Sequence, residues 1–202
     1  MIHPPTLSPA RLWLGLATVN TIGLTLALVT QSPFSLAALY RHQGIVRSNQ
    51  GDYALALESF QRLVSLQPED PESFLLRGIA QARAGAYQEA LDDFETASQL
   101  SPGRPEPWVA RGNTLILIEG YRQAINAYSR ALKLDPEALE AYSGRSVAYE
   151  NLGQRKEALA DLQTLQERLV KQGQLAQAEV VQKRRETLRR APPTKPKPPL
   201  TF

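Results

Sequence analysis

Residues 71–104 read PESFLLRGIAQARAGAYQEALDDFETASQLSPGR, and the pattern of this 34-residue stretch recurs without insertion in the segments around it. The neighbouring segments are 37–70, 105–138 and 139–172. An aromatic residue stands fourth in each segment, a very small residue eighth, Ala twentieth, and a ring or Leu twenty-fourth. In that order the residues are Tyr40, Phe74, Trp108 and Tyr142; Gly44, Gly78, Gly112 and Ser146; Ala56, Ala90, Ala124 and Ala158; Phe60, Phe94, Tyr128 and Leu162. A fixed period of this length indicates stacked copies of one supersecondary unit.

Each copy is predicted to be an antiparallel pair of helices. The small residues let two helix backbones approach closely, while the rings fill the space between successive pairs. Asp70-Pro71 is typical of a helix cap followed by proline in the first turn, which restarts the chain as helix. The glycines expected to end the first helix in a left-handed conformation are Gly51, Gly85, Gly153 and, one place later in the third segment, Gly120.

This pattern resembles the tetratricopeptide-repeat family over about two thirds of the chain. Proline fills the thirty-second position of the first three segments, and the fourth departs with Val170. The resemblance implies an all-α solenoid of four helix-turn-helix hairpins, residues 37–172. Helical spacing continues through residues 173–190, which we expect to form a capping helix over the last apolar face.

Residues 1–36 form a different segment, in which residues 12–29 contain no formal charge. Eighteen such residues are at the lower limit of what can span a bilayer as a helix, so a single-pass N-terminal membrane anchor is one interpretation. A cleaved export signal is the second, because Ser35-Leu36-Ala37 offers small residues at the right positions for cleavage before Ala38. A buried core helix is the third. The expected location is therefore the membrane or, after cleavage, the periplasm or an organelle lumen.

The charge of the chain is concentrated at its C-terminal end. Residues 183–202 hold seven basic residues and one acid, a sum of +6, so the rest of the chain sums to −3 and the total is +3. Residues 191–202, APPTKPKPPLTF, are predicted to be a disordered Pro/Lys-rich tail, because proline excludes helix and central strand. This tail suits anionic lipid or an acidic partner, whereas nucleic acid is not expected because no aromatic residues are interleaved with the basic ones.

No constellation of residues typical of an enzyme is present. The sequence contains two histidines, His3 and His42, and no cysteine, so a histidine triad or a thiolate metal site is excluded within one chain. Phosphate-binding and nucleophile-elbow motifs are missing as well. We therefore predict no catalytic, cofactor-binding or metal-binding residues. The recurring Arg77, Arg111 and Arg145 are expected to form structural pairs with acids such as Asp93 or Asp161.

The resemblance implies that a partner binds the concave surface formed by the first helix of each hairpin. The residues implied for this groove are Leu75, Ile79, Val109, Asn113, Ile116, Leu117 and Val147, with Glu72, Glu106 and Glu140 along one edge. An apolar groove with an acidic margin suits an amphipathic or hydrophobic peptide that carries basic residues. The carboxylate clamp by which family members bind chaperone tails is not matched, because Arg41 is the one suitable cation at its positions.

The predicted function is a membrane-associated protein-interaction scaffold, most simply an assembly factor that holds a peptide or a membrane-protein subunit. A leading apolar segment followed by a few repeats is similar in layout to the membrane-anchored, repeat-containing photosystem I assembly factors. The alternatives are a stable structural subunit of a membrane complex and an exported repeat protein.

Overall fold

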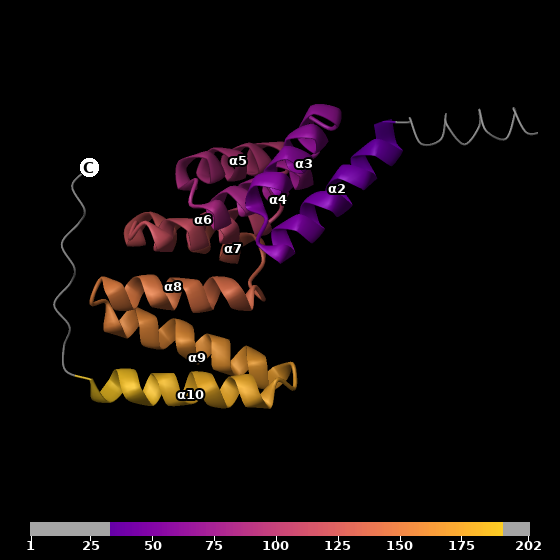
Figure 1. Ribbon diagram of the computed structural model, residues 1–202. Coiled ribbons are helices and arrows are strands. Elements are labelled where there is room, and N and C mark those ends of the chain that lie inside the picture. The colour runs from indigo at the N-terminus through magenta and orange to yellow at the C-terminus, as the bar shows by residue number, and fades with distance from the viewer. Residues whose placement is uncertain (1–32, 192–202) are drawn as a thin grey trace, which may run out of the picture.

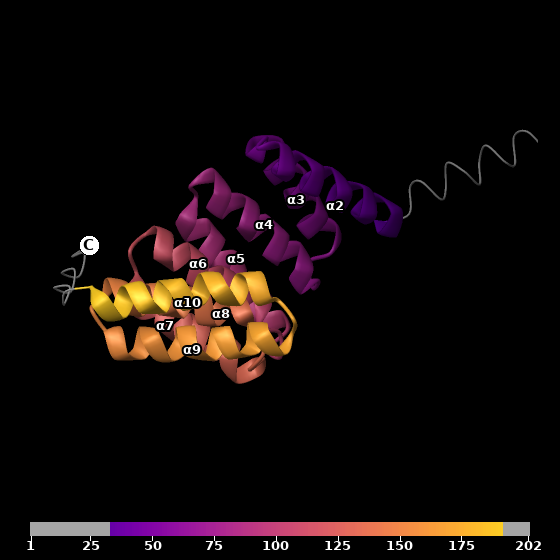
Figure 2. The same cartoon turned by 90° about the horizontal axis from the view of Figure 1, so that it is seen from below.

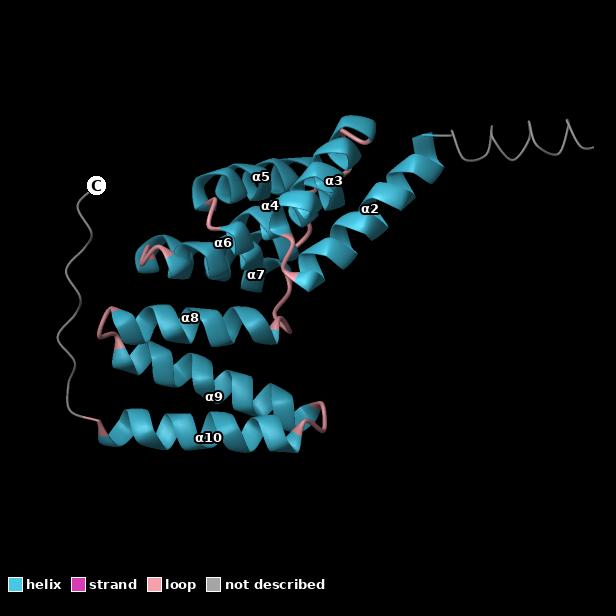
Figure 3. Cartoon of the chain, in the orientation of Figure 1, coloured by secondary structure: helices cyan, strands magenta, loops and turns pink. Residues whose placement is uncertain are grey.

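The structure, a computed structural model, describes residues 33–191, with side chains from Leu36 onward. In this range the chain is a series of antiparallel helix pairs closed by one further helix, without strands (Figures 1 and 3). The pairs are α2 (Pro33–Gln50) and α3 (Tyr53–Leu66), α4 (Pro71–Ala84) and α5 (Tyr87–Leu100), α6 (Glu106–Leu117) and α7 (Tyr121–Leu134), and α8 (Leu139–Asn151) and α9 (Arg155–Lys171); α10 (Leu175–Arg190) closes the series. The predicted all-α solenoid of hairpins with a C-terminal capping helix is confirmed.

The predictions for the two ends of the chain concern residues outside the described range. Residues 12–29, interpreted as an anchor, a signal or a core helix, and residues 192–202 of the basic tail lie outside the described residues. Among the helices from Pro33 to Arg190, none combines the length and the apolar character that crossing a bilayer requires.

The turns inside the hairpins follow the 34-residue period even where the sequence does not supply a glycine. Gly51, Gly85 and Gly153 adopt the predicted left-handed conformation, with φ of 84°, 86° and 72°. The prediction for Gly120 was wrong, since its φ is −74° and Glu119 takes the left-handed conformation at φ 58°. Glu119 lies at the same repeat position as the three glycines, so the stacking of the third hairpin fixes the turn there and overrides the preference of the residue.

Close approach of the two helices within a hairpin depends on the predicted small residues. A β-carbon at Gly78 would lie 2.6 Å from Cε1 of Phe94, and one at Gly112 would lie 2.6 Å from Cε1 of Tyr128. Real β-carbons keep a greater distance from ring atoms, so these glycines provide the space in which each ring is buried. The rings Phe60, Phe94 and Tyr128 are accordingly almost completely buried.

Successive hairpins stack so that their first helices adjoin. α4 contacts both α2 and α6, and α6 contacts α8. α10 packs along α9, stands in front of α8 in the view of Figure 2, and is joined to α8 by an ion pair of 2.7 Å between Arg184 and Glu150. The first helices α2, α4, α6 and α8 therefore form one continuous layer, and α10 covers α9 at the C-terminal end of the series.

The first helix of the series, α2, carries apolar side chains on a face that is buried in every later hairpin. Leu39 and Val46 are 47% and 37% exposed. The residues at the same repeat positions in the later hairpins are all buried: Ser73 and Ala80, Pro107 and Thr114, and Ala141 and Ala148. Ala80, for example, packs into the core cluster of Phe60 and Leu63 in the preceding hairpin. Among the described residues no hairpin precedes α2, and none of them covers this face.

Candidate functional site

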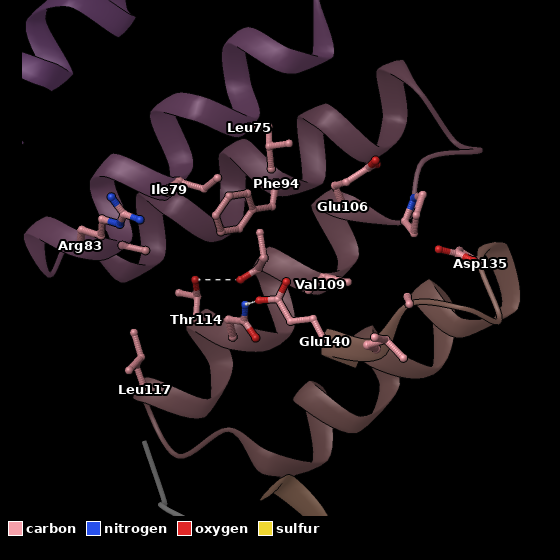
Figure 4. Close-up of a pocket in the computed structure, with 16 residues that line it drawn as sticks. Leu75, Ile79, Arg83, Phe94, Glu106, Val109, Thr114, Leu117, Asp135 and Glu140 are labelled. Carbon is pink, nitrogen blue, oxygen red and sulfur yellow. Dashed lines mark hydrogen bonds between the residues drawn. The ribbon is translucent and has the colours of Figure 1, made fainter. Parts of the chain in front are cut away.

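A groove of about 560 Å³ opens between α4, α6 and α8 (Figure 4). Its lining comes mainly from these three first helices, together with Phe94 of α5 and the turn before α8. The complete set of lining residues is Leu75, Ile79, Ala82, Arg83, Phe94, Pro105, Glu106, Val109, Ala110, Asn113, Thr114, Leu117, Asp135, Ala138, Leu139 and Glu140. The groove is therefore a product of stacking, because no single hairpin contains it.

The floor of the groove is apolar. Leu75 and Val109 are buried, and the ring of Phe94 closes the floor beneath them. Leu117, at the end of α6, is 59% exposed although it is a large apolar side chain. An apolar surface of this kind is stabilised when a partner covers it and removes it from water.

The run from Leu115 to Ile118, which is apolar on every side of a helix, divides between the core and the groove. Leu115 is buried, while Ile116 and Ile118 pack against the core of the third hairpin. Leu117 alone projects into the groove. One residue of this run is therefore free for a partner, and the other three stabilise the fold.

A chain of hydrogen bonds fixes the polar centre of the groove. The hydroxyl of Tyr128 donates to Oδ1 of Asn113 at 2.6 Å, and Nδ2 of Asn113 donates to Oε1 of Glu140 at 2.7 Å. Burial raises the pKa of the Tyr128 hydroxyl, and the charge of Glu140 raises it further, so this hydroxyl stays protonated as a donor. Gly144 of α8 makes room for the Tyr128 ring, because a β-carbon there would overlap it. The side chain of Asn113 is thus oriented from below and holds the Glu140 carboxylate at the centre of the groove.

The charges around the groove are mostly negative. Its lining holds three carboxylates, Glu106, Asp135 and Glu140, and one guanidinium, Arg83, which gives a net charge of −2. Arg104 moderates the edge next to α4, since it contacts Glu72 at 2.9 Å and Glu106 at 3.1 Å. Among the described side chains no cation forms an ion pair with Glu140, and its hydrogen bond comes from the neutral amide of Asn113. The groove therefore favours a ligand that carries positive charge.

The structure places seven of the ten predicted groove residues in this lining: Leu75, Ile79, Val109, Asn113, Leu117, Glu106 and Glu140. The other three lie elsewhere. Ile116 packs in the core, Val147 is half-buried on α8, and Glu72 is paired with Arg104 beside the groove. The remaining lining residues were not predicted for the groove. Phe94 is identified by the repeat pattern as a core ring of a second helix, and Asp135 lies in a turn between hairpins.

The recurring arginines are structural, as predicted, in two of three places. Arg77 binds Asp93 at 2.6 Å and Arg145 binds Asp161 at 2.7 Å, and in each pair both groups are largely buried. In the third hairpin Ala127 stands where the aspartate would be, and Arg111 lies over the ring of Trp108 at 5.9 Å. Arg41, the single cation at a clamp position, is bound to Asp70 at 2.9 Å. None of these arginines lines the groove.

Between residues 33 and 191, no three His, Asp or Glu side chains come together in an arrangement that could hold a metal ion.

Comparison with known proteins gives consistent results for sequence and structure. Family models of the tetratricopeptide repeat match residues 43–111 and 120–153. Among proteins with curated descriptions, no sequence matches the chain. A crystal structure of MamA is similar to 75% of this chain and 86% of its own, with 23% identity and a TM-score of 0.64. MamA from Desulfovibrio magneticus RS-1 covers 77% of this chain and 96% of its own, with 22% identity and a TM-score of 0.59.

A second kind of solved structure contains a bound peptide. The second such domain of human RPAP3, in complex with the HSP70 peptide SGPTIEEVD, covers 58% of this chain and 98% of its own, at 20% identity and a TM-score of 0.55. At these identities the likenesses establish a shared fold, formed by the same succession of helix pairs.

Proposed function

Since the chain belongs to the tetratricopeptide-repeat family, we propose that it is a protein-interaction scaffold whose groove between α4, α6 and α8 holds a segment of a partner protein. The observation that carries this proposal is the exposed apolar side chain of Leu117 above a floor of buried apolar residues. An exposed apolar surface in a groove is typical of a site that a partner covers.

The negative charge of the groove indicates which charge the bound segment of the partner should carry. The peptide in the human RPAP3 complex, SGPTIEEVD, contains three acidic residues, and the groove of the present chain itself holds three carboxylates against one arginine. Like charges in an interface are repulsive, so an acidic peptide of that kind is disfavoured here. We expect a segment with two or three apolar side chains and at least one lysine or arginine, which would meet Glu140 at the centre of the groove.

The finer proposal is a membrane-associated assembly factor, which would hold a subunit of a membrane protein or its exposed segment through the groove. Support comes from the charge-free residues 12–29, which precede the repeats. The alternatives are a stable subunit of a membrane complex and an exported repeat protein. If mass spectrometry found the mature N-terminus at Ala38, the membrane-anchor hypothesis would be wrong and the protein would be an exported one.

Affinity capture from detergent-solubilised membranes tests the groove. We compare the wild-type chain with Leu117→Lys, which removes the exposed apolar contact and adds a positive charge at the groove. Val180→Lys is the matched control, because Val180 is also apolar and exposed but lies on α10 outside the groove. We expect Leu117→Lys to lose the principal partner and Val180→Lys to retain it, with circular dichroism unchanged in both.

The same preparation separates the two membrane roles. A partner recovered in equal amounts through a density gradient would indicate a subunit, and substoichiometric recovery with immature complexes would indicate an assembly factor. Equal recovery of the partner by Leu117→Lys and wild type would refute the assignment of the groove.

A further inference from the structure

We propose that the basic C-terminal tail, residues 192–202, occupies the groove of its own chain and competes there with the partner. This inference rests on the proposed function, because it concerns the same groove. The tail lies outside the described residues. Its sequence, the position at which α10 ends, and the charge of the groove support the inference.

The tail has the chemistry that the groove favours. Its sequence, PPTKPKPPLTF, contains Lys195 and Lys197, no acid, and the apolar residues Leu200 and Phe202. The groove offers a net charge of −2 and an apolar floor around Val109. Opposite charges would meet, and apolar side chains would be placed on an apolar surface.

The position of α10 brings the tail to the correct end of the groove. α10 ends on the same side of the molecule as the turns that follow α6 and α8 (Figure 3). Arg83 and Leu117, near the ends of α4 and α6, form the mouth of the groove on that side. Two steps between first helices, from α10 past α8 to α6, cover about 20 Å at the usual spacing of packed helices of about 8–10 Å.

The length of the tail is sufficient for this path. Proline-rich chain extends by about 3.1 Å per residue, so the eleven residues after Ala191 can span about 34 Å. Glu140 stands near the start of α8, about 17 Å at 1.5 Å per residue from the end of α8 beside which α10 ends, so with about one and a half helix spacings sideways the direct path to it is about 22 Å. Extended chain as far as Lys197 covers about 19 Å of this path, and the lysine side chain would cover the rest. Leu200 and Phe202 would then reach the apolar floor around Val109.

Attachment to the chain makes even a weak contact effective. A short tether gives an effective concentration of about 1 mM, so a tail that binds with a Kd of about 100 µM would weaken an external competitor about tenfold. The tail would act as an intramolecular competitor, and only a partner that binds the groove with higher affinity than the tethered tail would displace it.

Spin labels on the full chain test the proposal directly, since the chain contains no cysteine and an introduced pair is unique. We place one label at Ala84→Cys, an exposed position beside the mouth, and one at Thr201→Cys in the tail. We expect a short and narrow distance distribution that becomes broad in Lys195→Glu/Lys197→Glu. The control pair, Asn126→Cys with Thr201→Cys, places the first label on the exposed side of α7 and should be broad throughout.

A labelled peptide of residues 187–202, titrated onto the full chain, provides the second measurement. We expect it to bind Lys195→Glu/Lys197→Glu about tenfold more tightly than wild type, and to bind neither chain when Leu117→Lys is present. A broad distribution from the Ala84 pair, or a short distance that arises only between singly labelled molecules, would overturn the proposal. If Leu117→Lys lost the partner but the Ala84–Thr201 distance distribution were broad, the proposed function of the groove would be supported and only the binding of the tail would be refuted.

Discussion

Replacing Glu119 by glycine should stabilise the protein, although glycine usually weakens a fold. At the same position of the other three hairpins, Gly51, Gly85 and Gly153 have φ between 72° and 86°, and Glu119 is forced to φ 58°. A left-handed conformation costs a residue with a β-carbon about 1–2 kcal/mol. Glycine adopts this conformation without that cost, which stabilises the folded state. Its greater conformational freedom also stabilises the unfolded chain, by about 0.5–1 kcal/mol, and this offsets part of the effect. The net effect expected for Glu119→Gly is a stabilisation of about 0.5–1 kcal/mol.

Urea and thermal unfolding followed by far-UV circular dichroism measure this effect. A gain of that size corresponds to an increase in Tm of about 1–4 °C for a chain of this length. Glu119→Ala is the essential control, since it removes the carboxylate and its contacts but keeps the β-carbon, and it should give no stabilisation. Gly85→Ala should lower stability by a similar net amount, about 0.5–1 kcal/mol, through backbone conformation alone, because a β-carbon there meets no atom within 4 Å. Equal stabilities for Glu119→Gly and Glu119→Ala would refute the explanation from backbone conformation.

Two further predictions concern positions where one hairpin departs from the others. Ala127→Asp should lower the free energy of unfolding by no more than about 1 kcal/mol, because Arg111 occupies the repeat position from which Arg77 and Arg145 bind an aspartate. Ala131→Asp, on the same helix and also buried, has no such arginine and should lower it by about 3 kcal/mol or more. Urea midpoints of the two variants check this, and equal losses would contradict the inferred pairing. Val46→Lys should change stability by less than about 0.5 kcal/mol, and Ala80→Lys, at the same repeat position, should unfold the second hairpin. A large loss in Val46→Lys would show that residues 12–29 pack on α2 as a core helix.

The fold could be predicted because the repeat imposes the same physical demand four times. Gly78 and Gly112 leave room for the rings of Phe94 and Tyr128, and the interval between them is the interval between the hairpins. A pattern of this kind is read from spacing alone and needs no knowledge of long-range contacts. The position of Glu119 could not be predicted in the same way, since the sequence offers Gly120 one residue later and only the stacked structure decides between them.

The groove could be predicted where it follows the same spacing and not where it depends on neighbours. Leu75, Val109 and Asn113 lie in it because first helices form the continuous layer of the solenoid. Ile116 differs, because a helix that is apolar on every side gives no indication of which residue turns toward the core. Phe94 and Asp135 contribute through the packing of one hairpin on the next, which the periodic pattern of a single repeat does not contain.

The polar centre shows how the same core residue can serve both fold and site. Tyr128 occupies the repeat position of Phe60 and Phe94, and its ring fills the third hairpin as theirs fill the first two. Its hydroxyl is the one addition, and the absence of a β-carbon at Gly144 leaves room for that hydroxyl to reach Asn113. Through Asn113 this single oxygen atom determines where the Glu140 carboxylate stands in the groove. The charge that the groove presents to a basic segment, whether from a partner or from the tail, is therefore positioned by a residue that the repeat pattern identifies only as core.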